Sequence, residues 1–218
     1  MRFGAIIVAA VTGFGVPAMA HPHIFIDAGL EVIFDDQGRA TALRISWIYD
    51  DLTSLGIVSD RGMDEDFDGV LTAEELTAIA GFDMKWDAGF AGDSYALLNT
   101  VPLTLTGPED WTASYKDAKL TSTHLRRFAE PVQITDKPLV VQLYDPTYYV
   151  GYTVVAETTL TNGDTCTAQT ITPNLDAADI IFQAALAQIP IGGNVENEYP
   201  AVGAAYADEV RISCAAPS

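Results

Sequence analysis

Two stretches near the start of the chain alternate between apolar and polar residues, residues 24–34 and residues 40–49. A period of two is typical of a β-strand with one buried face. The apolar positions are Ile24, Ile26, Ala28, Leu30, Val32, Phe34, Leu43, Ile45, Trp47 and Tyr49. The intervening Asp-Asp-Gln-Gly at residues 35–38 favours a turn, so the pattern predicts a β-hairpin.

The hairpin predicts which residues meet at its open end. If a four-residue turn joins the strands, His23 lies opposite Asp50, and a one-residue slip places His21 opposite Asp51 instead. Imidazole nitrogens suit Zn²⁺, Ni²⁺ and Cu²⁺, so these four residues form a candidate transition-metal site at the mature amino terminus. The alternative is a frayed chain end with solvated histidines.

The middle of the chain contains short apolar-rich runs separated by turn residues such as Asn99-Thr100 and Lys116-Asp117. This spacing is typical of an antiparallel, sandwich-like sheet. The expected strands lie at residues 95–98, 101–106, 111–115, 120–128, 132–134, 139–144 and 149–157. His124 falls in one of them, either as a surface or packed strand residue or as a further metal ligand near the amino-terminal histidines.

Residues 175–188 repeat apolar positions with helical spacing, and Asn174 or Asp176 is suited to cap the helix. The residues expected to face the core are Leu175, Ala178, Ile181, Phe182, Ala185, Leu186 and Ile189. The predicted fold class is α+β, with an antiparallel β-rich, sandwich-like core, one C-terminal amphipathic helix and an inserted EF-hand helix-loop-helix.

Residues 64–75 predict this insert, because they fit the pattern of an EF-hand calcium loop with Gly69 at its sharp turn. Helices are expected on both sides, the first with Leu52, Leu55 and Val58 as its apolar stripe, so that the insert spans residues 51–82. The expected Ca²⁺ ligands are Asp64, Asp66, Asp68, the Val70 carbonyl, Thr72 and Glu75. Thr72 and Glu75 also form a candidate capping box. The alternative is an acidic surface turn before a helix.

The first twenty residues are typical of a secretory signal peptide, with Arg2, an apolar run and an Ala18-Met19-Ala20 cleavage site. No second apolar span follows, so residues 21–218 are expected to form one exported domain without a membrane span. In such a protein the two cysteines, Cys166 and Cys214, favour a disulfide that stabilises the fold by about 4 kcal/mol. Thiol metal ligands and a redox pair are the less favoured alternatives.

The chain carries 30 acidic and 11 basic side chains, a formal net charge of −19. This charge excludes nucleic acids and anionic membrane surfaces as partners, because both require basic patches. It suits a protein that binds cations, although solubility alone also accounts for it. The motifs of nucleophilic, phosphate-binding and zinc-protease enzymes are missing from the sequence, so we expect no enzymatic activity.

Four features coincide with this picture: the opening His21-Pro22-His23, the acidic insert, the run Tyr144-Asp145-Pro146-Thr147-Tyr148-Tyr149 and the terminal segment Gly203–Cys214. Together they resemble a bacterial family of exported proteins catalogued as a domain of unknown function. Members of that family are often labelled the periplasmic component of an uncharacterised ABC-type transport system. The resemblance implies a periplasmic location, a link to divalent-metal transport and a membrane metal transporter as partner.

Two functions follow from these expectations. The first is an exported calcium-binding protein that serves as a periplasmic metal-binding accessory to a divalent-metal transport system. The alternative is a calcium-stabilised envelope interaction or adhesion module with no transported cargo. Calcium affects the melting temperature in both cases, whereas the amino-terminal histidines bind a transition metal only in the first.

Overall fold

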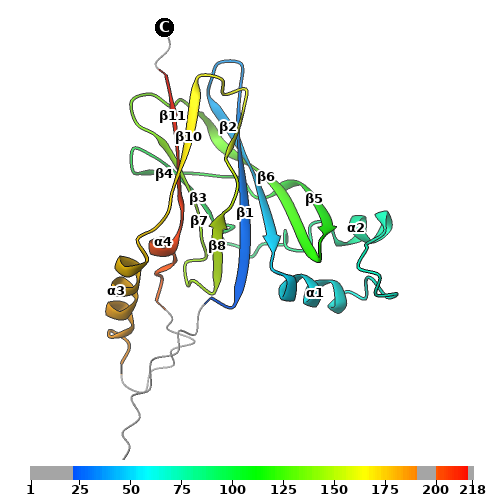
Figure 1. The fold of residues 1–218 in the computed structure, drawn as a ribbon. Coiled ribbons are helices and arrows are strands. Elements are labelled where there is room, and N and C mark those ends of the chain that lie inside the picture. The colour runs from blue at the N-terminus through cyan, green and yellow to red at the C-terminus, as the bar shows by residue number, and fades with distance from the viewer. Residues whose placement is uncertain (1–21, 191–199, 216–218) are drawn as a thin grey trace, which may run out of the picture.

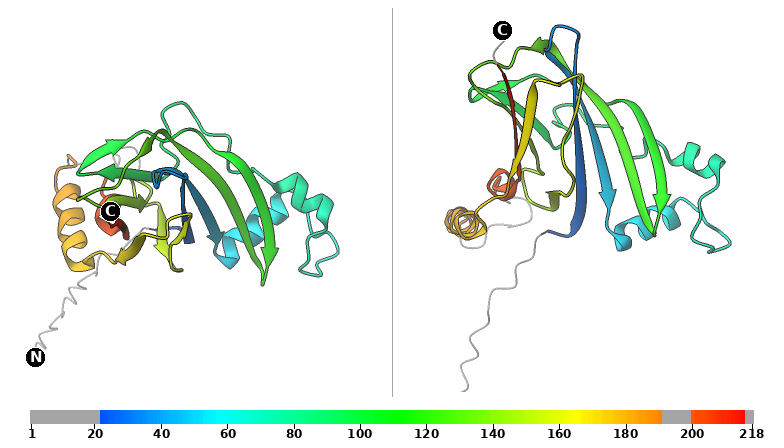
Figure 2. Two further views of the ribbon diagram at one scale, coloured as in Figure 1. Left: turned by 90° about the horizontal axis from the view of Figure 1, so that it is seen from above. Right: turned by 45° about the horizontal axis from the view of Figure 1, so that its top comes forward.

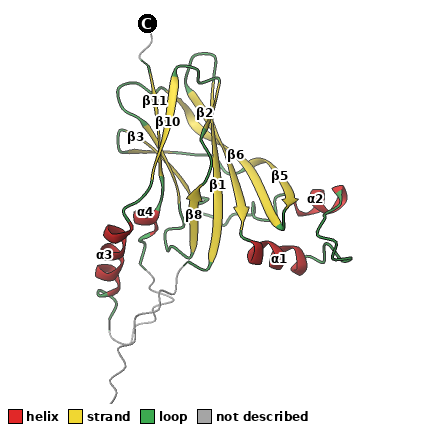
Figure 3. Ribbon diagram, viewed as in Figure 1, coloured by secondary structure: helices red, strands yellow, loops and turns green. Residues whose placement is uncertain are grey.

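A computed structural model describes residues 22–190 and 200–215, which form two β-sheets with four helices at their margins (Figure 1). The expected signal peptide and His21 lie outside the described residues. Figure 3 shows that more of the chain lies in strands than in helices. None of the described helices has the length and apolar character needed to cross a membrane.

The first sheet has the strand order β5-β6-β2-β1-β8, and β9 also pairs with β1. Its strands are β1 (Ile24–Phe34), β2 (Ala40–Tyr49), β5 (Glu109–Lys116), β6 (Lys119–Val132), β8 (Val150–Val154) and β9 (Thr159–Thr161). β8 and β9 both run parallel to β1. The predicted antiparallel core is therefore wrong at β8 and β9. Alternation along a strand reports which side chains are buried and carries no information on the direction of its partner.

The second sheet is antiparallel, with the order β10-β11-β7-β3-β4. Its strands are β3 (Ser94–Leu98), β4 (Val101–Leu103), β7 (Leu139–Leu143), β10 (Cys166–Ile171) and β11 (Glu209–Cys214). Cys166 and Cys214 are register partners in β10 and β11 and form the predicted disulfide. Both sheets contribute to one apolar core, which includes Ile26, Leu30, Ile45, Trp47, Ala96, Val141, Leu143, Val210 and Ile212.

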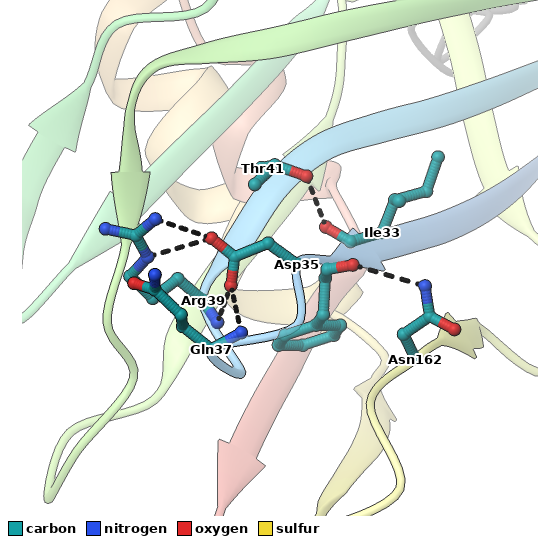
Figure 4. Close-up of polar contacts among 7 residues, drawn as sticks. Ile33, Asp35, Gln37, Arg39, Thr41 and Asn162 are labelled. Atoms are coloured by element: carbon teal, nitrogen blue, oxygen red, sulfur yellow. Dashed lines mark hydrogen bonds and ion pairs between the residues drawn. The ribbon is translucent and has the colours of Figure 1, made fainter.

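The predicted hairpin is confirmed as β1 and β2, but its register differs from the one expected. Asp35 accepts hydrogen bonds from the backbone of Gln37 and Arg39, so Asp35 rather than Phe34 stands opposite Arg39 (Figure 4). A bulge at Thr41, whose hydroxyl donates to the Ile33 carbonyl, shifts the pairing by one more residue. The observed ladder therefore continues from Ile26↔Tyr49.

The predicted EF-hand helix pair is also wrong. Helix α1 (Asp51–Asp60) ends before the acidic loop, because the Met63 N–H bonds the Val58 carbonyl and the Gly62 N–H bonds the Ser59 carbonyl. This is a Schellman closure with Gly62 in the left-handed region, at φ 62°. Of the expected stripe only Val58 is buried, whereas Leu52 and Leu55 are exposed.

Helix α1 contacts β6 and helix α2 contacts β5, so both helices pack on the first sheet. Helix α2 (Ala73–Ile79) opens with the predicted Thr72–Glu75 capping box. Val58, Leu71, Ile79 and Leu120 share a small apolar cluster between the helices and β6. Figure 2 shows this segment projecting beside β5 and β6.

The predicted core-packed C-terminal helix is likewise corrected. Helix α3 (Leu175–Leu186) is capped by Asn174, but Leu175 and Ile181 are more than half exposed. Its contacts, through Ala178, Phe182 and Ala185, are with the short helix α4 (Gly203–Tyr206) rather than with the inter-sheet core. Figures 1 and 2 place α3 on the opposite side of the molecule from α1 and α2. Helical periodicity identified an apolar face without identifying what that face contacts.

Candidate functional site

The acidic loop brings three carboxylates together, as the sequence predicted. Single oxygens of Asp64, Asp66 and Asp68 lie within 4.8 Å of one another, the sole such grouping of three His, Cys, Asp or Glu side chains among the described residues. Asp64 is partly buried and the other two are exposed. The loop achieves this convergence through left-handed backbone at Asp64 and Gly69, with φ of 53° and 78°.

Backbone N–H groups hold two of the three carboxylates in place. The Gly69 N–H donates to both Asp64 oxygens, at 3.2 and 3.3 Å, and the Val70 N–H donates to Asp68 Oδ1 at 2.8 Å. No ion pair in the described part of the chain reaches this loop. The three negative charges therefore repel one another without a compensating cation from the protein.

Glu75 closes the loop rather than joining the three-carboxylate group. Its Oε2 accepts hydrogen bonds from the Thr72 backbone at 2.8 Å and the Thr72 hydroxyl at 2.9 Å. Its Oε1 accepts from the Asp64 N–H at 2.9 Å. The hydrogen bonds from Thr72 and then Asp64 lower the pKa of Glu75. Glu75 thus ties the first residue of the loop to the start of α2, beside the cluster.

The histidine set predicted for a transition metal is only partly brought together. His23 is exposed, with its N–H bonded to the Tyr149 carbonyl and its ring 4.8 Å from the Tyr149 ring. Asp50 caps α1, accepting from the backbone and hydroxyl of Thr53, and it also accepts from the Phe25 N–H. The predicted register would have paired His23 with Asp50. The observed ladder instead brings Asp50 to Phe25, because Asp35 pairs with Arg39 and shortens the turn by one residue, and because Thr41 forms a bulge.

The remaining two members of that set differ sharply in their surroundings. Asp51 is an exposed residue in the first turn of α1. His124 is fully buried on β6 opposite Ile45, with its ring 4.7 Å from that of Trp47 and 5.6 Å from that of Trp86. Burial, and then the charge of Arg126, lower the pKa of His124 to about 3, so the ring is neutral at physiological pH. His124 is therefore a packed strand residue.

Two tyrosine–carboxylate pairs, formed by tyrosines of the apolar core, escaped the sequence reasoning. The Tyr49 hydroxyl donates to Asp83 Oδ2 at 2.8 Å, and the Tyr152 hydroxyl donates to Asp93 Oδ2 at 2.8 Å. Burial raises the pKa of both carboxyls, that of Asp93 to about 7. Asp83 and Asp93 lie at the two ends of a loop whose sequence is typical of solvent-exposed loops. Its aromatic Trp86, which packs against Gly92, was the available signal that this loop covers the interior.

Comparisons with known proteins give a family without an activity. A family model described as a protein of unknown function (DUF1007) matches residues 6–214. An uncharacterized protein of Haemophilus influenzae is 22% identical over 227 residues, a region that covers 98% of this chain and 100% of that protein. The chemistry must therefore be argued from this chain's own residues.

Proposed function

The chain belongs to the DUF1007 family of proteins of unknown function, and we propose that this member is an exported protein that binds a calcium ion in the loop Asp64–Glu75. The observation that carries the proposal is the convergence of Asp64, Asp66 and Asp68 within 4.8 Å. A bound cation would relieve the repulsion among these carboxylates, and the folded protein would gain stability by mass action.

The donor chemistry selects the type of ion. The group offers only carboxylate oxygens, with no imidazole or thiolate, which suits a hard cation. Calcium accepts six to eight oxygens in flexible geometry, whereas magnesium demands a near-ideal octahedron and keeps its water. An exposed loop with three carboxylates fits calcium better. Thr72, Glu75 and the Val70 carbonyl are the adjacent oxygens that would complete the shell.

The disulfide between Cys166 and Cys214 supports export, because such bonds persist in oxidising compartments. We propose a periplasmic location, which the disulfide and the resemblance to exported transport components support. There the ion would brace the α1–α2 segment against β5 and β6, a role that requires no transported cargo.

Calcium titration of the mature protein by calorimetry, with melting curves in calcium and in chelator, tests the proposal. We expect saturable binding and a higher melting temperature in calcium. Both should be lost in Asp64→Asn/Asp68→Asn. Asp36→Asn is the matched control, since Asp36 is an exposed acid in the β1–β2 turn. Identical melting curves with and without calcium would overturn the assignment.

A second function, delivery of a transition metal to a membrane transporter, is favoured by one observation. The Phe25–Asp50 hydrogen bond joins the start of β1 to the start of α1, so exposed His23 and Asp51 lie at the same end of the sheet. Equilibrium dialysis with Zn²⁺, Ni²⁺ and Cu²⁺ tests this idea on protein with its native amino terminus. Equal metal content in His21→Ala/His23→Ala would refute it and leave the calcium proposal untouched.

A further inference from the structure

Arg126 is a buried cation without an acidic partner in the described part of the chain. Its side chain lies on β6 and is 5% exposed, yet no carboxylate of the described residues forms an ion pair with it. This is notable in a chain with 30 acidic residues. Buried arginines are normally paired, because an isolated charge in the interior is costly. Burial accordingly lowers the pKa of Arg126 to about 10.

The protein holds this guanidinium in a fixed orientation. Nε donates to the Thr106 carbonyl at 2.9 Å, and Nη1 donates to the Ala91 carbonyl at 2.6 Å and the Ser94 hydroxyl at 2.8 Å. The Trp86 ring lies 5.0 Å from Cζ, within range of a cation–π contact. Nη2 makes no hydrogen bond to a described residue and remains available as a donor to a ligand.

A cavity of about 400 Å³ lies against this side chain, a volume typical of small-molecule sites. Among the described residues that line it, Arg126 is the one that carries a charge. The remaining wall is largely apolar or aromatic and includes Phe90, Leu103 and the stacked rings of Tyr95 and Tyr144, whose centroids are 4.1 Å apart. Burial raises the pKa of Tyr95 to about 12, so its hydroxyl stays protonated and can donate.

We propose that this cavity binds a small organic carboxylate, with the carboxylate on Arg126 and an apolar or aromatic body against Tyr95, Tyr144 and Leu103. The bound carboxylate would supply the counter-charge that Arg126 lacks. Because Arg126 is already buried, the ligand carboxylate is the only charged group that would lose its water on binding. An apolar body suits the site because the rest of the described wall is largely apolar or aromatic. This site is separate from the acidic loop and does not depend on calcium.

NMR shift titration of the mature protein in chelator tests the proposal, with benzoate as probe. We expect saturable binding of benzoate. Two control compounds, benzyl alcohol, its neutral isostere, and acetate, which lacks the apolar body, should each bind with at least about tenfold lower affinity. Arg126→Met should weaken benzoate binding by a similar factor. Arg127→Met is the matched control, because Arg127 is half exposed and paired with Glu109.

Leu103→Trp keeps Arg126 and fills the cavity, so it decides the matter if Arg126→Met fails to fold. We expect at least a tenfold loss of benzoate affinity in this variant as well. The proposal is overturned if wild-type protein shows no saturable binding up to about 10 mM benzoate. It is also overturned if Leu103→Trp binds normally, or if inorganic phosphate competes as well as benzoate, which would indicate a bare anion site.

Discussion

Ser54 is the polar anchor that fixes α1 to the first sheet, and its removal gives a sharp test of how the acidic loop is held. The Ser54 side chain is fully buried; its hydroxyl donates to the Tyr49 carbonyl at 3.1 Å and accepts from the Leu120 N–H at 2.9 Å. One hydroxyl thus joins α1, the end of β2 and β6. The sequence offered no sign of this role, since a serine in a helix usually faces solvent.

Ser54→Ala should lower the free energy of unfolding, because it leaves the Leu120 N–H without its acceptor. Leu120 is also fully buried, so water has no access to its N–H once the acceptor is gone. A buried donor left without a partner costs about 1–3 kcal/mol of folding stability. The loss of the packing contacts of the small hydroxyl group itself adds little to this cost. For a chain of this length the melting temperature should fall by roughly 2–4 °C for each kcal/mol.

Urea unfolding and native-state hydrogen exchange provide the measurements. Ser59→Ala is the control, because Ser59 is exposed on the same helix. The change in helix propensity from serine to alanine is therefore the same in both variants. We expect Ser54→Ala to be less stable than Ser59→Ala by about 1 kcal/mol or more and to show faster exchange of the Leu120 amide. Equal stability of the two variants, with an unchanged Leu120 exchange rate, would refute the reasoning.

Three further predictions concern other parts of the fold. Replacing Cys166 and Cys214 by serine should lower the free energy of unfolding by about 4 kcal/mol, since the bridge closes a separation of 48 residues, as urea midpoints will show. Thr72→Ala should cost about 1 kcal/mol through the lost cap of α2 and should weaken calcium binding, measurable by the same calorimetry. Burial raises the pKa of Asp93 from 3.8 to about 7, so the folded state keeps a proton that the unfolded chain releases and stability falls as the pH rises through this window. Asp93→Asn should therefore be more stable than wild type at pH about 8, and the difference should shrink toward pH about 4 in urea titrations; a difference independent of pH would contradict the shift.

The hairpin and the acidic cluster show what the sequence determines locally. The alternation of residues 24–34 and 40–49 predicts β1 and β2 with their correct bounds. Every second side chain of a strand lies on the same face, so a strand with one buried face has apolar residues at every second position. The spacing of Asp64, Asp66 and Asp68 predicts carboxylates that do converge. In both cases the interacting residues are close in the chain, so local backbone geometry is enough.

The errors arise where tertiary contacts decide. The parallel partners of β1 and the site against which α3 packs depend on segments more than a hundred residues away or on another helix. The predicted hairpin register failed for a local reason: the turn is one residue shorter than expected and Thr41 forms a bulge, and neither is visible in the hydrophobic pattern. Asp83 and Asp93 were missed because acids beside glycines resemble a solvated loop until Trp86 is seen to cover the interior.

The positions of Ser54 and Glu75 indicate which part of the fold calcium binding would stabilise. The hydrogen bonds that hold the carboxylates of the acidic loop lie within residues 64–75. The α1–α2 segment meets the first sheet through the Phe25–Asp50 hydrogen bond, through Ser54, and through the Val58, Leu71, Ile79 and Leu120 cluster. Binding energy released in the loop therefore acts first on the α1–α2 segment, which opens more easily than a core with two sheets. Calcium should then raise amide protection in α1 and α2 much more than in β7 or β11. Uniform protection across both sheets would mean instead that the segment and the core unfold as one unit, and that the loop braces the whole fold.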